Sequence, residues 1–133
     1  MDYYSTGRTN YFKVKDPAAF KSWAQSFGAE IVTNKKQPGC YALLFDNGIP
    51  DMRQSESTGD ELVEFDFFED LKDHLKGNEV AIYMEAGAEG HRYVNGFATA
   101  VCPGKKDISI SIDQIYDLAE KKFKNQKITS ATY

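Results

Sequence analysis

The stretch that decides the fold runs from Glu79 to Ile112 and reads EVAIYMEAGAEGHRYVNGFATAVCPGKKDISISI. It contains three segments with the β-branched and aromatic residues that are typical of strands, and these segments are 79–85, 91–102 and 108–112. Short connections with turn residues separate them, at 86–90 and 103–107. Strands joined by connections this short pair in antiparallel fashion. The stretch therefore predicts an antiparallel meander, which is typical of a small α+β domain.

Three amphipathic helices are predicted around this meander. Each begins at a residue whose side-chain oxygen can accept a hydrogen bond from an unpaired backbone N–H group, namely Asp16, Asp66 and Ser111. Apolar residues then recur at helical spacing. The first two helices end at glycines, Gly28 and Gly77, which favour the left-handed conformation of a helix end. The helices are therefore expected over 17–27, 67–76 and 112–124.

Three more strands are predicted upstream, at 10–15, 30–33 and 40–45. The element order is then β-α-β-β-α-β-β-β-α, with a short strand or turn before the second helix. We expect a single α+β domain over 1–133, with a mainly antiparallel sheet of five to six strands and the helices packed mainly on one face. The ends, 1–9 and 125–133, are expected to be flexible, and 49–59 is predicted to be a mobile loop.

Composition excludes several classes of function. The chain of 133 residues has 20 acidic and 16 basic residues, so it lacks the basic field of a nucleic-acid-binding protein. Cys40 and Cys102 are far apart and only two histidines accompany them, so neither a zinc site nor another metal or cofactor site is expected. No apolar run approaches the roughly 20 residues that span a membrane, and the N-terminal residues do not resemble a signal peptide. We expect a cytoplasmic protein with free thiols.

Negative charge is densest on the second predicted helix and just before it. Helical spacing places most of these carboxylates on one ridge, opposite the apolar residues Phe68, Leu71 and Leu75. The ridge consists of Glu64, Asp66, Glu69, Asp70 and Asp73. Such a ridge is either a solvated helix face or a docking surface for a basic partner. It does not specify a metal ion, because carboxylates along one helix without a glycine-containing loop do not define a coordination site.

Two other interpretations compete with a docking surface. The open face of the sheet, with its tyrosines, could bind a small molecule. Glu85 and His91 flank one predicted turn, and a carboxylate beside an imidazole could act as an acid–base pair in a small hydrolase-like enzyme. An exposed hairpin tip explains the same two residues without catalysis. No nucleophile motif or phosphate-binding loop supports an enzyme.

Parts of the chain resemble small uncharacterised proteins that phages and other mobile elements carry. The similar runs are YFKVKDPAAF at 11–20, GNEVAIYMEAGAE at 77–89 with its continuation to Tyr93, and IDQIY at 112–116. These motifs are structural, so the resemblance implies a biological context and no catalytic residue. Small acidic proteins of that kind often bind host machinery, and anti-restriction and anti-CRISPR proteins are among them.

The leading hypothesis is therefore a non-enzymatic interaction protein that inhibits or modulates a host macromolecule. A nucleic-acid-handling defence complex such as CRISPR–Cas is one such target. The acidic ridge, helped by the loop 49–59, would contact a protein partner that is basic or binds nucleic acid. Direct contact with nucleic acid or a membrane is not expected. An exposed sheet edge could also pair two copies into a homodimer.

Overall fold

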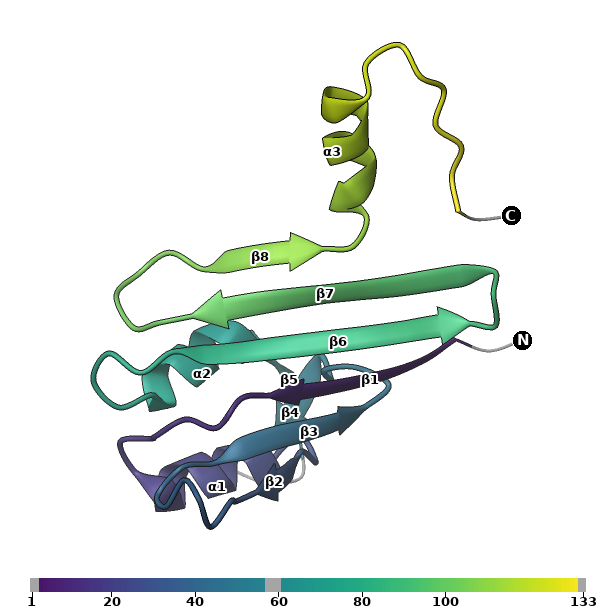
Figure 1. The fold of residues 1–133 in the computed structure, drawn as a ribbon. Coiled ribbons are helices and arrows are strands. Elements are labelled where there is room, and N and C mark those ends of the chain that lie inside the picture. Colours follow the sequence, from purple (N-terminus) through teal and green to yellow (C-terminus); the bar gives the residue numbers. More distant parts are fainter. Residues whose placement is uncertain (1–2, 57–60, 132–133) are drawn as a thin grey trace.

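A six-stranded antiparallel sheet forms the centre of the computed structural model, which describes residues 3–56 and 61–131 (Figure 1). In spatial order its strands are β2 (Glu30–Val32), β3 (Ala42–Asp46), β1 (Tyr4–Thr9), β6 (Ala81–Glu89), β7 (Tyr93–Val101) and β8 (Ile108–Ser111). The helices are α1 (Pro17–Gln25), α2 (Phe67–His74) and α3 (Gln114–Lys122). A separate hairpin joins β4 (Met52–Gln54) to β5 (Leu62–Glu64). The predicted α+β class and element order are confirmed.

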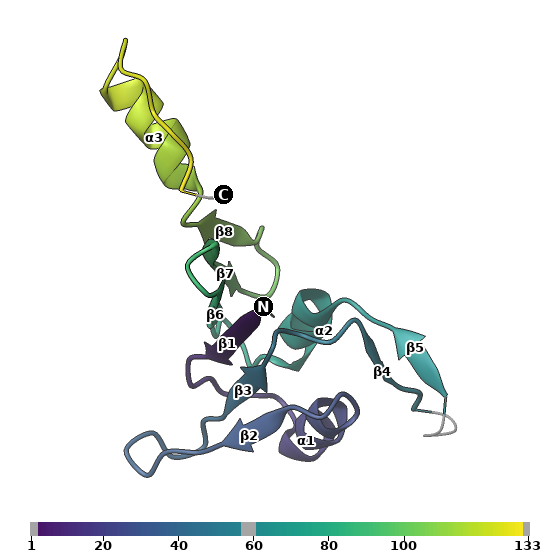
Figure 2. The ribbon, with the colours of Figure 1, turned by 90° about the vertical axis from the view of Figure 1, so that its right-hand side faces the viewer.

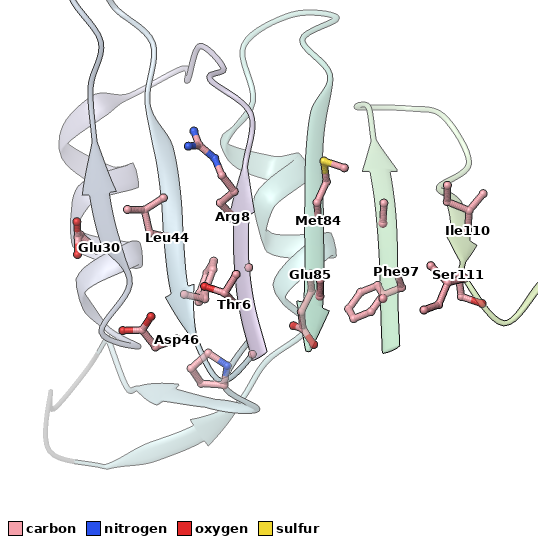
Figure 3. Close-up of a pocket in the computed structure, with 18 of the residues that line it drawn as sticks. Thr6, Arg8, Glu30, Leu44, Asp46, Met84, Glu85, Phe97, Ile110 and Ser111 are labelled. Atoms are coloured by element: carbon pink, nitrogen blue, oxygen red, sulfur yellow. The ribbon is translucent and has the colours of Figure 1, made fainter. Parts of the chain in front are cut away.

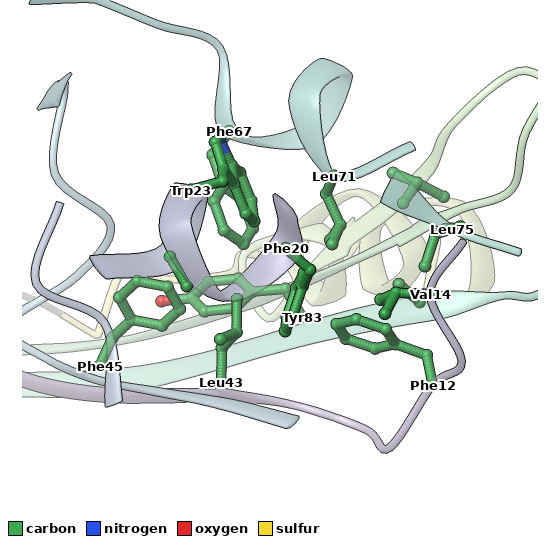
Figure 4. Close-up of a cluster of buried hydrophobic side chains, with 13 residues drawn as sticks. Phe12, Val14, Phe20, Trp23, Leu43, Phe45, Phe67, Leu71, Leu75 and Tyr83 are labelled. Atoms are coloured by element: carbon green, nitrogen blue, oxygen red, sulfur yellow. The ribbon is translucent and has the colours of Figure 1, made fainter. Parts of the chain in front are cut away.

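The core lies between one face of the sheet and the first two helices (Figure 4). Phe20 and Trp23 of α1 are buried there, together with Phe67 and Leu71 of α2. From the sheet, Tyr83 is fully buried and its ring packs edge to face against Phe45 and Phe67. Most of the abundant aromatic residues of this layer therefore act as packing residues.

The N-terminal strand corrects the sequence prediction. Residues 4–9 were expected to be flexible, but they form β1, which pairs with β3 on one side and β6 on the other. The predicted strand 10–15 makes only isolated bridges, through Phe12 to Tyr41 and through Val14 to Leu75. Phe12 and Val14 are nevertheless buried, so the alternating pattern was right about burial and wrong about strand pairing.

The reason is a close fit between β1 and β6. Gly7 is paired with Glu85, and a Cβ atom at Gly7 would overlap the phenol of Tyr83. The small residues of this segment suggested a frayed end, but Gly7 is needed because β6 carries the large ring of Tyr83 beside it. The position of β1 therefore depends on a residue that lies more than 70 positions further along the chain.

The β6–β7 hairpin is longer than predicted. Strand β6 continues through the expected turn 86–90 and ends at Glu89, so the turn comprises Glu89 to Arg92. Gly87 therefore lies within β6 and not in a turn. A glycine is needed there because a Cβ atom would lie 2.5 Å from the hydroxyl oxygen of Tyr3. Gly90 has the positive φ angle of 54° that the tight turn requires.

The segment predicted as a loop contains a strand. Met52–Gln54 within it pairs with Leu62–Glu64, so part of 49–59 is an ordered hairpin arm. Positions 57–59 of the predicted loop lie outside the described residues.

Two of the three predicted helix caps are confirmed. Asp16 accepts hydrogen bonds from the N–H groups at 18 and 19, and Asp66 accepts from those at 68 and 69. Ser111 is not a cap, because the chain stays in β8 up to that residue. The return half of the expected capping box is formed, because the side chain of Gln114 accepts a hydrogen bond from the N–H of Ser111, at 3.2 Å.

The sheet is covered on one side only. In Figure 2, α1, α2 and the β4–β5 hairpin all lie on the same side of the sheet, and α3 continues beyond the edge strand β8, away from the core. The predicted apolar stripe of α3 was expected to cover the sheet, but its residues Ile115, Leu118 and Phe123 are exposed. Only two residues separate β8 from α3, and this connection is too short to return the helix over its own sheet.

Candidate functional site: the open face of the sheet

The uncovered side of the sheet, which we call the open face, is defined by strand register. Paired residues in neighbouring strands point to the same side. Arg8 pairs with both Leu44 and Met84, Met84 pairs with Ala98, and Ala98 pairs with Ile110. Figure 3 labels Leu44, Arg8, Met84 and Ile110 of this row, which lie across the sheet from β3 to β8. Alternate residues before and after the row belong to the same face.

Large apolar side chains gather on the β6–β8 half of the open face. Met84 of β6 is 60% exposed, and Ile108 and Ile110 of β8 are 68% and 62% exposed. Ile82 of β6 and Ile112, just after β8, extend this surface, and small alanines of β7 lie between them. On the covered side of the same strands, Tyr83 and Val101 are almost fully buried. Strands β6 and β7 thus have the composition of strands that are covered on both faces.

A hollow of about 880 Å³ includes much of the open face in its lining and also reaches residues of the covered side, among them Phe45, Glu85 and Phe97. Its apolar wall is formed by Leu44, Met84, Ala98 and Ile110. Its polar end carries charged side chains from the first three strands of the sheet, Arg8, Glu30 and Asp46 (Figure 3). The guanidinium of Arg8 lies 5.6 Å from the centre of the Tyr11 ring. The hollow is therefore amphipathic along its length.

The predicted acid–base pair is not formed. Glu85 points to the covered side, where it accepts a 2.6 Å hydrogen bond from the hydroxyl of Tyr83. His91 lies exposed in the β6–β7 turn, and β6 runs four residues past Glu85, which is roughly 13 Å of strand. Burial, together with the bond to Glu85, raises the pKa of the Tyr83 hydroxyl. These residues form a structural pair and do not assemble a catalytic site.

The acidic ridge is largely engaged within the protein. Asp66 caps α2, and the carboxylate of Asp70 accepts a 3.0 Å hydrogen bond from the indole of Trp23. Arg53 Nε lies 3.8 Å from the same Asp70 oxygen. Glu69 forms an ion pair of 2.8 Å with Lys72. Three of the five ridge carboxylates, Asp66, Asp70 and Glu69, therefore already bind a group of the same molecule.

The other two ridge residues remain on the surface. Glu64 at the end of β5 and Asp73 in α2 are exposed, and neither makes an ion pair within the part of the chain that the structure describes. Lys72 reaches a second acid as well, since its Nζ lies 3.2 Å from Asp107. The two carboxylates together raise the pKa of Lys72. The ridge therefore offers much less free negative charge than its sequence suggests.

The described residues contain neither a cluster of metal ligands nor a membrane-spanning helix. Within residues 3–56 and 61–131, no group of three or more histidine, cysteine, aspartate or glutamate side chains could hold a metal ion. Cys40 and Cys102 are both half-buried free thiols. None of the helices in this part of the chain is long and apolar enough to cross a membrane.

Comparisons with protein-family models, with curated proteins and with solved structures found no match to this chain. They accordingly indicate no enzyme family or enzyme fold.

The sequence carried a partial signal for the open face. The run ISISI at 108–112 alternates strictly, which predicts one apolar side for β8. In β6, however, the residues that point to either side of the sheet are apolar over 81–84. This pattern is equally typical of a strand that the protein's own helices cover on both sides. The small-molecule interpretation did invoke the open face, but its tyrosines are divided: Tyr83 is buried on the covered side, and Tyr4 is exposed on the open face.

Proposed function

We propose that the protein is a non-enzymatic interaction protein that binds another protein through the open face and the adjoining apolar side of α3. The observation that supports this most directly is the group of exposed large apolar side chains that β6 and β8 carry on one face, with further exposed apolar residues on α3 beyond the sheet edge. Monomeric soluble proteins rarely leave contiguous apolar patches of this kind in water, and such patches are typical of binding surfaces.

This proposal moves the contact surface away from the acidic ridge. The ridge carboxylates that cap α2 or bind Trp23 and Lys72 are already satisfied inside the molecule. Lys72 and Arg53 offset the charges of Glu69 and Asp70, so the ridge attracts a basic partner less than five free carboxylates would. Within the described residues, by contrast, the large apolar side chains of the open face stay exposed to water. Inhibition of a host defence complex, which the resemblance implies, is one version of the same proposal.

Site-specific photo-crosslinking in cells that make the protein tests the proposal. A photoreactive amino acid replaces Met84, in the centre of the open face, and in a matched variant it replaces Lys76, which is exposed beyond the end of α2. We expect a protein adduct from position 84 and much less from position 76. Equal adduct formation at the two positions, or none at position 84, would count against the open face as a binding surface.

Charge reversal separates the open face from the acidic ridge. Glu64→Lys with Asp73→Lys changes the two ridge residues that neither cap α2 nor make an ion pair with the described residues, and Ile110→Asp places a charge in the apolar surface. Since burial of an unpaired charge is costly, Ile110→Asp should suppress the adduct from position 84 at least tenfold. The double reversal should leave that adduct unchanged, whereas its loss would return the contact to the ridge.

A small-molecule-binding role is the second candidate, and the hollow supports it. A volume of about 880 Å³ falls within the range of roughly 300–1,000 Å³ that is usual for ligand sites. Ala98→Phe fills the centre of the hollow with a ring and leaves its rim intact. A ligand that raises the melting temperature of the natural protein should then fail to do so for this variant. If no compound in a metabolite screen raises the melting temperature, this candidate is rejected.

A further inference from the structure

We propose that the protein bound at the open face is a second copy of this chain. In this dimer the α3 helix of each copy packs across β6–β8 of the other, so that both open faces are covered by the same exchange. The inference rests on the proposed function, namely that the open face is a protein-binding surface, and it identifies the partner.

Within the described residues, helix α3 covers no strand of the sheet, and its tie to a distant residue is the bond from the Ala131 N–H to the Tyr116 hydroxyl, 2.7 Å. Its residues Ile115 and Leu118 are 60% and 59% exposed and lie on one side of the helix, and Phe123, directly after its end, is 58% exposed. Asp117, Glu120 and Lys121 lie on the other side, whereas helical spacing places Lys122 in line with Ile115 and Leu118. Isolated helices of nine residues are marginal in water, and their stability comes from packing of the apolar side. The helix therefore needs a surface to cover.

The direction of α3 is set at its junction with the sheet. Only Ile112 and Asp113 separate β8 from α3. The N–H of Ile112 donates to the carbonyl of Gly96 in β7, and the N–H of Ser111 donates to the side chain of Gln114 in α3. These bonds hold the first turn of α3 beyond the edge of its own sheet, as Figure 2 shows. The helix thus points to where the sheet of a second copy would lie.

The two unpartnered surfaces match in size and kind. A helix of nine residues is about 13 Å long, and three neighbouring strands span about 10 Å between the outer two. One α3 is therefore long enough to cross β6, β7 and β8. The covered side of the same sheet already accepts two amphipathic helices, α1 and α2, by apolar packing. Small residues of β7, Ala98 and Ala100, leave room in the centre of the open face for the larger side chains of a helix.

Charge also favours this exchange. A helix that enters from the edge at β8 ends near β6 and β1, beside the polar end of the hollow. Its last turn carries Lys121 and Lys122, and the polar end of the hollow carries Glu30 and Asp46. Arg8 of β1 pairs with Met84 of β6, so it would lie near the C-terminus of the incoming helix. The partial negative charge of a helix C-terminus attracts a cation. Among these charged residues, Arg8 on β1 is the nearest to such a helix end, and the acids Asp46 and Glu30 follow on β3 and β2, so the helix dipole and the lysines each have a group of opposite sign beyond β6.

A two-fold exchange closes on itself. Each copy supplies one helix and receives one, so the interface is isologous and needs no further copies. Stable interfaces bury on the order of 1,600 Å² in total. In a reciprocal exchange the same helix–sheet contact occurs twice, so the dimer buries twice the area of one contact. The larger buried area favours a stable pair over a transient one. The edge strand β8, where an unpaired strand would otherwise face water, lies at the centre of the dimer.

Light scattering of the purified full chain gives the first test. We expect a mass of twice the 15.0 kDa chain at micromolar concentration. Leu118→Asp in α3 and Ile110→Asp in β8 should each shift the protein to the monomer mass. Asp117→Lys, on the charged side of α3, should leave the dimer unchanged. Both apolar sites are exposed in the single chain, so circular dichroism of the variants should match that of the natural protein. A natural protein of single-chain mass overturns the proposal.

Cysteine pairing distinguishes exchange from a helix that folds back. In a background with Cys40→Ser and Cys102→Ser, one chain carries Ala98→Cys and another carries Leu118→Cys. Mild oxidation of the mixture should give a disulfide-linked heterodimer, and a chain with both changes should give linked dimers. A chain with both changes that closes on itself as a monomer overturns the inference, because α3 then covers its own sheet.

The two proposals fail in different ways. If the purified protein is a monomer but position 84 crosslinks to a different protein, the open face is still a binding surface and only the identity of the partner is wrong. If position 84 forms no adduct and the protein is a monomer, both proposals are wrong.

Discussion

At the scale of single residues, the contact between Gly7 and Tyr83 decides how the N-terminal strand enters the sheet. Gly7→Ala should destabilise the protein by about 1–3 kcal/mol, because the new methyl group would overlap the phenol ring and overpack the core. Urea unfolding measures the change. In a Tyr83→Phe background the same substitution should cost less, since the hydroxyl is the closest atom. Equal costs in the two backgrounds would show that the glycine is needed for another reason.

His74 makes the stability of the fold dependent on pH. Its ring lies 4.8 Å from that of Trp23 and 6.0 Å from that of Phe20, and burial lowers its pKa in spite of nearby acids, of which Asp70 acts most strongly. The unfolded chain takes up a proton near the usual pKa of about 6.5. Between that value and the lower folded pKa, the unfolded state binds more protons. Stability is therefore complete above about pH 6.5 and falls as the pH decreases below it.

Urea unfolding at pH 7.5 and pH 5.5 tests this dependence. We expect a lower free energy of unfolding at pH 5.5, and we expect His74→Gln to remove part of that decrease. His91→Gln, which changes the exposed histidine of the β6–β7 turn, is the matched control and should retain the decrease. If both variants lose the same amount of stability between the two pH values as the natural protein does, His74 is not the group responsible.

At the scale of elements, the bond from Trp23 to Asp70 joins α1 to α2. Asp70→Ala leaves the indole N–H of a residue that is only 5% exposed without an acceptor, which should cost about 1–3 kcal/mol. Asp73→Ala changes an exposed acid of the same helix and should cost less than about 0.5 kcal/mol. Thermal unfolding of the two variants gives the comparison. Similar costs would show that Asp70 acts only as a surface charge.

The elements also show how far the sequence could predict the fold. The caps of α1 and α2 were predictable because Asp16 and Asp66 bond to backbone groups two and three residues away. The strand β1 was not predictable, since its place depends on Tyr83, far along the chain. The roles of the acidic residues failed for the same reason. Helical spacing placed Asp70 on a ridge, but its partners Trp23 and Arg53 come from distant segments.

At the scale of the whole molecule, a sheet covered on one side and a helix with no surface to cover lie in the same chain. The amphipathic pattern of α3 was read correctly, yet a sequence does not state whether such a helix packs on its own sheet or on another. The exposed Ile115 and Leu118 of α3 and the exposed Met84 and Ile110 of the sheet follow from this single arrangement. Burial of these side chains by a partner would remove most of the large apolar surface that now faces water.

The most direct test of this account is the solvent accessibility of individual methyl groups in the purified protein. A soluble paramagnetic probe broadens the NMR signals of methyl groups that water can reach. If the open face and α3 are covered, the methyl signals of Met84, Ile110 and Leu118 should be nearly as protected as that of the buried Val101. Leu62 of β5, which is 60% exposed and lies outside the open face, should be broadened. Broadening of all three signals to the extent seen for Leu62 would contradict the account.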